Sequence, residues 1–296
     1  MNSFHYDFAI IGGDKRQVYM ANELIARNFS VIAYGLQDPA LDLSCIAADS
    51  MADAMVSSQI ILTPIPVSKD GINILTQNVK TDLTVDQLCR FLTFGQKLFG
   101  GCLTKEIIKC CESKEIFYLD LMEQEEIVLF NTIATAEGTI AEAILGSNSN
   151  LHGSSCMILG FGRCARTLAE KLKGLCGSID IAARSPIALA AANAASYGSV
   201  PLSGLDKKIN GYDYIFNTIP SLIITRELLM KTNPNVVIID ISSAPGGIDF
   251  NASSEIGRNA RLCLGLPGKY APKASADFLI EYLLTILERS DSYVFA

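Results

Sequence analysis

The sequence predicts an α/β protein made of two doubly wound domains, each built on a parallel sheet. Three observations indicate this fold class. Short apolar runs alternate with segments of helical periodicity, this alternation starts twice along the chain, and both starts lead into a glycine turn. With 296 residues, the chain is long enough for two domains that each bury a core.

The first series predicts an N-terminal domain over residues 1–130. The expected elements are a strand at 8–11, a helix at 15–28 and strands at 31–34 and 60–62. The strands are continuous apolar runs, as in parallel sheets that are covered on both faces, and Gly12 and Gly13 turn the chain after the first of them. We expect this domain to be flavodoxin-like and to hold the substrate.

The second series predicts a C-terminal domain over residues 151–273, joined to the first by a helix and linker at 131–150. The expected elements are a helix at 163–174 and strands at 156–159, 179–183, 214–217, 236–241 and 262–264. Residues 265–273 are expected to form a rigid loop. Residues 274–289 carry the apolar stripe of an amphipathic helix, which we expect to pack back on the N-terminal domain.

The composition predicts a well-packed cytoplasmic protein. Hydrophobic residues make up 49% of the chain, but no apolar run reaches the ~18 residues of a membrane helix, and the N-terminus has no signal-peptide pattern. A net charge of −7 argues against nucleic acid as a partner, because such proteins carry a basic footprint. The nine cysteines show no metal-ligand spacing, so we expect reduced thiols and no metal site.

The strongest motif is Gly160-Phe161-Gly162-Arg163-Cys164-Ala165, a G-x-G-x-x-A fingerprint between a predicted strand and a predicted helix. The first glycine permits a tight turn, the second lets backbone approach a pyrophosphate, and the alanine lets the helix lie close to the sheet. We therefore predict a Rossmann-type dinucleotide site in which Gly160, Gly162 and Arg163 bind the cofactor. The alternative is a structural glycine turn in a domain that binds no dinucleotide.

The end of the next strand favours NADP over NAD. NAD-binding domains usually place an acidic residue about 20 positions after the fingerprint, where it holds the ribose hydroxyls. Arg184 and Ser185 occupy that stretch here, and a guanidinium and a hydroxyl suit a 2′-phosphate. The alternative is that Arg184 is a solvated surface charge and that either cofactor is accepted.

Two later strand ends carry polar loops. Thr218 and Pro220 follow the strand at 214–217 and are predicted to line the nicotinamide ribose, because ligands bind at the carboxyl ends of such strands. The loop from Asp240 to Ser243 is a weaker prediction of the same kind. Both loops are also compatible with ordinary turn chemistry.

Substrate-binding and catalytic residues are predicted from local charge. Gly13, Lys15 and Arg16 lie at a strand-to-helix turn, where a helix N-terminus and two cations suit a carboxylate, although a capped surface turn would look the same. Glu137, expected in the first turn of the joining helix, and Lys269 are the predicted catalytic residues. Acids also occur in first turns for dipole reasons alone, and Lys269 is equally compatible with a solvated lysine.

Several motifs together resemble one family, that of the dehydrogenase-like A-subunit of dipicolinate synthase, and they extend over nearly the whole chain. They are IGGDKRQ at 11–17, TAEGTI at 135–140, HGS at 152–154, LGFGR at 159–163, ARS at 183–185, NTIPS at 217–221, PGGIDF at 245–250 and GLPGKYAPK at 265–273. The C-terminal half is also similar to the cofactor domain of D-isomer 2-hydroxyacid dehydrogenases.

The resemblance implies NADP-dependent oxidation of 4-hydroxytetrahydrodipicolinate, a branch-point compound of lysine synthesis, to dipicolinate during sporulation. It also implies the flavoprotein-like B-subunit of dipicolinate synthase as partner and a location in the mother-cell cytoplasm. The alternatives are a dehydrogenase of another small carboxylic acid and a non-catalytic NADP-binding regulatory protein. An acid-base histidine late in the chain would favour the former, but no histidine follows His152. A homo-oligomer is compatible with this architecture.

Overall fold

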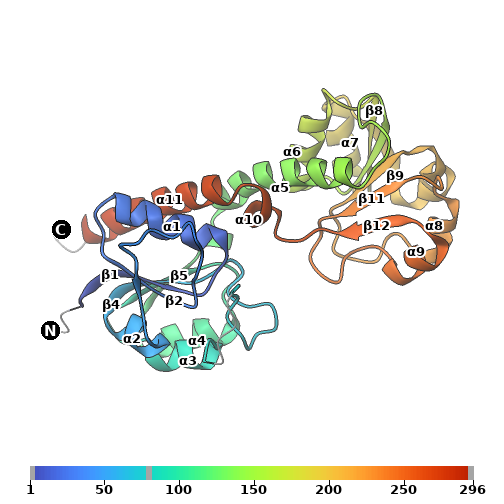
Figure 1. Cartoon of the computed structure of the whole chain (residues 1–296). Coiled ribbons are helices and arrows are strands. Elements are labelled where there is room, and N and C mark those ends of the chain that lie inside the picture. The colour runs from blue at the N-terminus through green and yellow to red at the C-terminus, as the bar shows by residue number, and fades with distance from the viewer. Residues whose placement is uncertain (1–3, 78–81, 293–296) are drawn as a thin grey trace. The chain divides into compact units, whose positions relative to one another are not determined.

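The computed structural model describes residues 4–77 and 82–292, which form two compact units (Figure 1). One unit combines the described residues up to Val128 with those from Ala271 onward, and the other comprises Leu129–Tyr270. Each unit has its own parallel sheet with helices on both faces. The predicted fold class, two doubly wound α/β domains, is confirmed.

The N-terminal unit is built on a six-stranded sheet of order β3-β2-β1-β4-β5-β6 within the described residues. Its strands are β1 (Tyr6–Ile11), β2 (Val31–Tyr34), β3 (Ile46–Ala47), β4 (Ser58–Leu62), β5 (Lys97–Gly100) and β6 (Phe117–Asp120), the last followed by a short 3-10 turn, Leu121–Glu123. Its helices are α1 (Lys15–Ala26), α2 (Met51–Val56), α3 (Val85–Phe91), α4 (Lys105–Ser113) and α11 (Pro272–Ser292). Alternate residues of β1 face opposite cores: Phe8 and Ile10 pack with α1 and α11, whereas Ala9 and Ile11 pack with α2, α3 and α4.

This strand order corrects the flavodoxin-like prediction. A flavodoxin-like sheet has the order 2-1-3-4-5, whereas this sheet has the Rossmann order 3-2-1-4-5-6. The difference comes from β3, which pairs with β2 through Ile46 and Ala47 alone. The sequence did not predict β3 because the strand has two residues, both exposed, and therefore no apolar run marks it.

The C-terminal unit has a second six-stranded sheet among the described residues, of order β12-β11-β10-β7-β8-β9. Its strands are β7 (Ser155–Leu159), β8 (Ser178–Ala183), β9 (Gly198–Pro201), β10 (Tyr214–Asn217), β11 (Val237–Asp240) and β12 (Asn259–Leu262). Its helices are α6 (Arg163–Leu172), α7 (Pro186–Ala194), α8 (Arg226–Lys231), α9 (Phe250–Ile256) and α10 (Leu266–Tyr270), with 3-10 turns at Leu202–Lys207 and Ile209–Gly211. Residues of α5, α6 and α7 are buried on one face of the sheet, and residues of α8 and α9 on the other.

Helix α5 (Glu125–Leu145) starts earlier than the sequence predicted. Glu125 and Glu126 occupy its first turn, so Glu137 lies in the middle of the helix rather than near its start. By length and composition α5 is apolar enough to cross a membrane, with 44% of its most apolar window buried. Its buried Ala136 and Ala143 pack in the core of the C-terminal unit, which marks α5 as a core helix.

Two predictions near the C-terminus are wrong in detail. The last strand is Asn259–Leu262 rather than 262–264, because this edge strand is half exposed and has no continuous apolar run. The predicted loop at 265–273 contains helix α10, and α11 begins at Pro272. Pro267 is tolerated because it lies in the first turn of α10, where its missing N–H would have no helical partner.

Helix α11 supplies a large part of the N-terminal core. Its Ala276, Leu279, Ile280 and Leu283 are at most 2% exposed and belong to the same core cluster as α1. Near them on the helix, Glu281 forms an ion pair with Arg27 of α1 at 2.9 Å. The Glu281 side chain is 67% exposed. The packing therefore depends on the apolar stripe and not on the surface ion pair.

We expect Leu283→Ala to lower the free energy of unfolding by about 2–5 kcal/mol, because it leaves a cavity between α11 and α1. Glu281→Ala, on the same helix, should cost no more than about 1 kcal/mol. Urea denaturation of the full chain measures both changes. Equal losses in the two variants would contradict this account of the packing.

Candidate functional site

The carboxyl edge of the C-terminal sheet has the geometry of a ligand site. β7 and β10 are neighbours, and the chain leaves them toward opposite edges of the sheet, toward β8 from β7 and toward β11 from β10. Such a topological switch point leaves a crevice at the carboxyl ends of the two strands, where doubly wound folds bind ligands. The loops that border it are Gly160–Gly162 after β7 and Thr218–Ser221 after β10.

Gly160 is required by the geometry of this crevice. Its φ is +95°, and a Cβ at this position would lie 2.5 Å from Thr218 Oγ1. Thr218 is in turn fixed to the end of β7, because its N–H and its hydroxyl both donate to the Leu159 carbonyl, at 3.0 and 2.8 Å. The close approach of the two loops therefore depends on the first glycine of the fingerprint.

Gly162 has a different reason to be glycine. It is the N-cap of α6, its backbone is extended, and no side chain caps the helix there. A Cβ on Gly162 would meet nothing within 4 Å, so the protein itself does not need a glycine at this position. Below it Ala165 is fully buried against the sheet. The result is an open helix N-terminus with room for an anion.

The loops after β10 and β11 are held by one buried carboxylate. Asp240 accepts hydrogen bonds from Asn217 Nδ2 at 2.9 Å, from the Ser242 hydroxyl at 2.7 Å, from the Ser242 N–H at 2.9 Å and from the Gly247 N–H at 2.7 Å. Asp240 and Asn217 are both fully buried. The sequence pointed to these two loops but not to the bond between them, since nothing in a sequence pairs two strand ends.

Arg184 and Ser185 follow β8 and are both exposed. Ser185 is the N-cap of α7, and its hydroxyl accepts from the Ala188 N–H at 3.5 Å. Arg184 makes no hydrogen bond or ion pair with any residue that the structure describes. Pro220 is likewise exposed at the end of the β10 loop.

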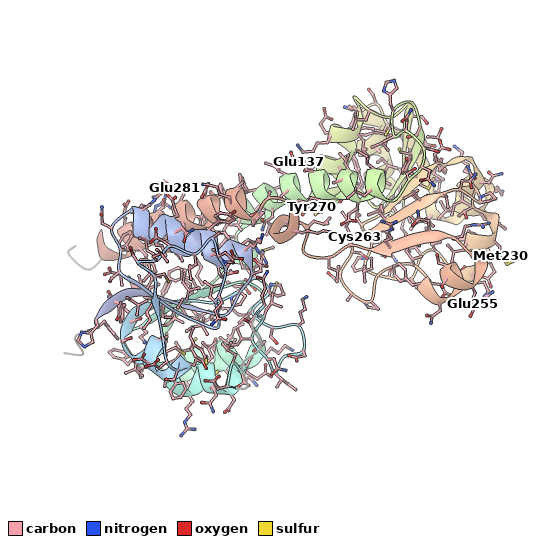
Figure 2. The ribbon with its side chains drawn as sticks, in the orientation of Figure 1. Glu137, Met230, Glu255, Cys263, Tyr270 and Glu281 are labelled. Atoms are coloured by element: carbon pink, nitrogen blue, oxygen red, sulfur yellow. The ribbon has the colours of Figure 1, made fainter. Side chains whose placement is uncertain are left out.

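The two predicted catalytic residues do not contact each other. Glu137 is on α5 with a side chain 55% exposed, and Lys171 of α6 donates to it at 2.8 Å. Lys269, on α10, pairs instead with Glu142 of α5 at 2.5 Å. Figure 2 shows Glu137 on α5 and Tyr270 on α10.

Glu142 is the partner of Lys269, and the sequence did not reveal this contact. It is 8% exposed and accepts from both Lys269 and the Tyr270 hydroxyl, the latter at 2.8 Å. The hydrogen bond from Lys269 lowers the pKa of Glu142 and outweighs its burial, and the same bond raises the pKa of Lys269. Gly138 makes the contact possible, because a Cβ there would lie 2.7 Å from the Tyr270 ring.

The predicted substrate residues of the N-terminal unit lie in a turn that is held by its own hydrogen bonds. Gly13 has a φ of +119°, Lys15 is exposed, and the Arg16 side chain is 7% exposed. Arg16 donates to both Asp14 oxygens, at 3.0 and 2.7 Å, and to the Ile65 carbonyl. Burial alone would raise the pKa of Asp14, but the hydrogen bond and charge of Arg16 hold it below the usual range. Asp14 and Gln17 also form a capping box on α1.

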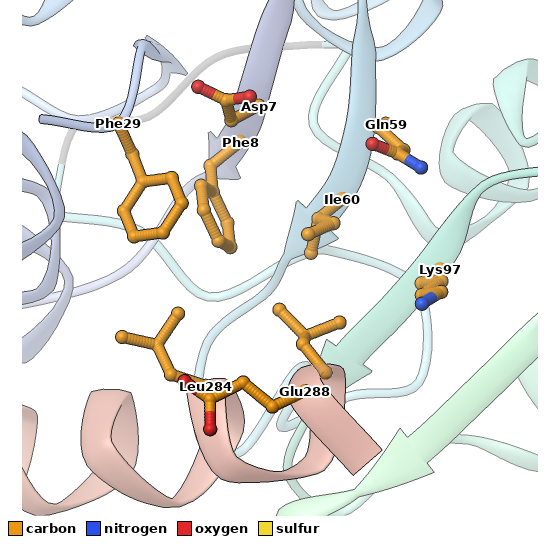
Figure 3. A pocket seen from close by; sticks show the side chains of 9 residues that line it. Asp7, Phe8, Phe29, Gln59, Ile60, Lys97, Leu284 and Glu288 are labelled. Atoms are coloured by element: carbon orange, nitrogen blue, oxygen red, sulfur yellow. The ribbon is translucent and has the colours of Figure 1, made fainter. Parts of the chain in front are cut away.

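The N-terminal unit also contains a hollow of about 280 Å³ (Figure 3). It is bordered by Asp7 and Phe8 of β1, by Gln59 of β4, and by Leu284 and Glu288 of α11. These strand residues lie at the amino ends of β1 and β4, whereas doubly wound sheets bind ligands at the carboxyl ends. We therefore assign it no part in the site.

Fold and site together define a class. The chain is a two-unit α/β protein whose C-terminal unit is a Rossmann-type domain, with the fingerprint loop between β7 and α6. Within that class, residues 7–122 match the family model for the N-terminal domain of the dipicolinate synthase A-subunit. The chain is 29% identical to the A-subunit of dipicolinate synthase from Bacillus subtilis (strain 168), over 94% of this chain and 95% of that protein. The resemblance predicted from the motifs is thus confirmed.

Solved structures agree with this resemblance. The dipicolinate synthase A-subunit from Bacillus halodurans superposes with a TM-score of 0.82 at 25% identity, covering 96% of this chain and 98% of that one. The corresponding structure from Bacillus subtilis gives a TM-score of 0.80 at 26% identity, covering 99% and 100%. A transhydrogenase from Sinorhizobium meliloti, at 14% identity, a TM-score of 0.63 and coverage of 95% and 92%, shares the fold.

We expect Gly160→Ala to lower the free energy of unfolding by about 1–3 kcal/mol, because alanine is strained at this φ and its Cβ meets Thr218. Gly162→Ala should cost no more than about 1 kcal/mol, since it changes an N-cap that has open space around it. Urea denaturation distinguishes the two variants. If Gly160→Ala is as stable as Gly162→Ala, the close approach of the two loops is not a constraint on the fold.

Proposed function

We propose that the C-terminal unit binds a nicotinamide dinucleotide, and specifically NADP, at the carboxyl edge of β7 and β10. The observation that carries this proposal is the uncapped N-terminus of α6 behind Gly160 and Gly162. Residues Gly160, Gly162 and Arg163 would hold the pyrophosphate, and Thr218 and Pro220 would line the nicotinamide ribose. The space beside Gly162 supports the fit, because a dinucleotide needs backbone approach at this point.

NADP is preferred because of Arg184 and Ser185. Both are exposed at the end of β8, where a Rossmann-type domain meets the adenosine ribose. Arg184 has no ion-pair partner among the described residues, and a 2′-phosphate would supply one. Ser185 can donate its hydroxyl hydrogen to a phosphate oxygen while its oxygen caps α7.

The proposed reaction is the formation of dipicolinate, as the names of the related proteins indicate. Loss of water from 4-hydroxytetrahydrodipicolinate gives a dihydropyridine dicarboxylate. Removal of one hydride and one proton from that ring gives the aromatic pyridine, and bound NADP would accept the hydride. Because aromatisation favours the step, the main task of the protein is to hold the ring in place and to bind its carboxylates.

Lys269 is the proposed carboxylate-binding or amide-binding cation of the C-terminal unit, and Glu142 is the proposed positioning residue behind it. A lysine ammonium has three N–H donors, so the bond to Glu142 leaves donors for a ligand. In the N-terminal unit, Gly13, Lys15 and Arg16 remain the proposed substrate residues. Of these, exposed Lys15 is best suited to direct contact, and Arg16 to holding the turn.

The related proteins are named as components of a larger enzyme, so we also propose a partner, the flavoprotein-like B-subunit of dipicolinate synthase. With it we propose a place in the cytoplasm of the mother cell during sporulation. Whether the dehydration takes place on this chain or on that partner decides whether this chain is active alone.

The first experiment mixes the purified chain with freshly generated 4-hydroxytetrahydrodipicolinate and NADP or NAD, with and without the flavoprotein-like partner. It follows reduced cofactor and pyridine dicarboxylate by their absorbance. Turnover with NADP by this chain alone supports the full proposal. Activity only with the partner makes this chain the cofactor-binding half of a two-part enzyme, and no activity in either case favours a regulatory role.

For cofactor choice, we expect Arg184→Ala to weaken NADP binding about 10- to 100-fold, because a charge-assisted hydrogen bond to the 2′-phosphate contributes about 1.5–3 kcal/mol. NAD lacks that phosphate, so its dissociation constant should not change. Titration of both cofactors by calorimetry measures this, with Arg226→Ala on α8, which loses only an exposed ion pair with Glu255, as the control. Parallel weakening of NADP and NAD would exclude a 2′-phosphate contact.

To test Glu142 as the positioning residue, we expect Glu142→Gln to lower kcat about 10- to 100-fold, because Lys269 would no longer be held in place. Glu137→Gln, on the same helix, should stay near wild type, because it loses an exposed ion pair. Glu142 raises the pKa of Lys269, so its replacement should also move the alkaline limb of the kcat/KM profile to lower pH. A large loss in Glu137→Gln alone would instead support the prediction that Glu137 is a catalytic residue.

A further inference from the structure

Two thiols of the C-terminal unit are in direct contact. Cys156 is a fully buried residue of β7, and Cys176 is a half-buried residue of the turn after α6. The Cys156 thiol donates to Cys176 Sγ at 3.0 Å. A disulfide S–S bond is only about 1 Å shorter than this contact. Ser154 Oγ lies 3.4 Å from Cys156 Sγ.

The two sulfur atoms have different chemical roles. The hydrogen bond from Cys156 lowers the pKa of Cys176, whereas the same bond, together with burial, raises the pKa of Cys156. Thiolates and not thiols are the nucleophiles in cysteine oxidation. Cys176, which is also the more accessible of the two, is therefore the attacking sulfur, and Cys156 is a proton donor beside it.

A second group of cysteines shows that closeness in sequence or space is not sufficient to make a thiol reactive. Cys110 of α4 donates its thiol to the backbone carbonyl of Cys89 at 3.4 Å. Burial raises the pKa of Cys89 to about 12, and likewise the pKa of neighbouring Cys111 to about 12. Neither provides a thiolate near neutral pH, so Cys89 and Cys111 should react slowly.

We propose that Cys156 and Cys176 form an oxidation site at which a peroxide produces an intramolecular disulfide. The Cys176 thiolate attacks one oxygen of the peroxide, the O–O bond breaks, and Cys176 becomes a sulfenic acid. The other oxygen leaves as hydroxide and takes up the proton that Cys176 had released, which gives the first water. Cys156 sulfur then attacks Cys176 sulfur, the S–O bond breaks, and the thiol proton of Cys156 leaves with that oxygen as water. With hydrogen peroxide, two thiols are oxidised to one disulfide and the peroxide is reduced to two molecules of water.

The bridge would enclose the fingerprint. Gly160, Gly162 and the whole of α6 lie between the two cysteines, so the disulfide ties the strand before the glycine turn to the end of the helix after it. A cross-link over a loop of this length restricts the unfolded chain. The oxidised C-terminal unit is therefore more stable than the reduced one.

The test exposes the purified full chain to hydrogen peroxide, blocks the remaining thiols and maps the tryptic peptides without reduction by mass spectrometry. Trypsin cuts after Arg163 and Lys173, so Cys156 and Cys176 fall in different peptides unless they are bridged. We expect one dominant cross-linked pair, 156 with 176, and a rise in melting temperature of roughly 5–10 °C that a reductant reverses.

The controls are two single variants. Cys176→Ser should form no cross-linked peptide and show no peroxide-dependent rise, whereas Cys45→Ser, in the N-terminal unit, should behave like wild type. If Cys176→Ser does not fold, the wild-type map alone decides. Separate peptides after peroxide treatment, a sulfinic acid at Cys176, or Cys156 joined equally to several cysteines would each overturn the proposal.

Discussion

The buried carboxylate of Asp240 is the interaction on which the ligand edge of the C-terminal unit depends. It accepts four hydrogen bonds, which join the end of β10, through Asn217, to the loop of Ser242 and Gly247 after β11. Loss of the carboxylate would leave several buried donors without partners, and each costs about 1–3 kcal/mol. The loops after β10 and β11 are thus held by the core of the sheet and do not need a ligand to order them.

The two units share one strand order, so the fold alone does not decide which of them is suited to a dinucleotide. The difference lies in how the first helix of each unit begins. In the N-terminal unit Asp14 caps α1 and pairs with Arg16, which places a carboxylate where a phosphate would have to lie. In the C-terminal unit Gly162 leaves the start of α6 uncapped. Chemistry at one position therefore distinguishes two units of the same topology.

How much could be predicted follows the same division between local and long-range features. The alternation of apolar runs and the fingerprint around Gly160 are local patterns, and they predicted both sheets and the open helix. Strands β3, β5, β6 and β9 were not predicted, and edge strand β12 was placed at the wrong residues. In β3 and β12 the reason is that neither has a continuous apolar run. Helix α10 was not predicted, because its glycine and proline indicate a loop when its contact with α5 is unknown. The bond between Asn217 and Asp240 joins residues on different strands, and only the fold brings them together.

The contact of Glu142 with Lys269 and Tyr270 was not predicted, although helical periodicity could have indicated it. Residues four apart share a helix face, so Gly138 and Glu142 point the same way, whereas Glu137 is five positions from Glu142 and points elsewhere. Gly138, in the family motif TAEGTI, is the position where α10 packs closely on α5. An acidic residue one turn after such a glycine faces the packed helix, where Lys269 and Tyr270 meet it. The glycine in this segment, and not the acid beside it, therefore indicates which carboxylate contacts Lys269 and Tyr270.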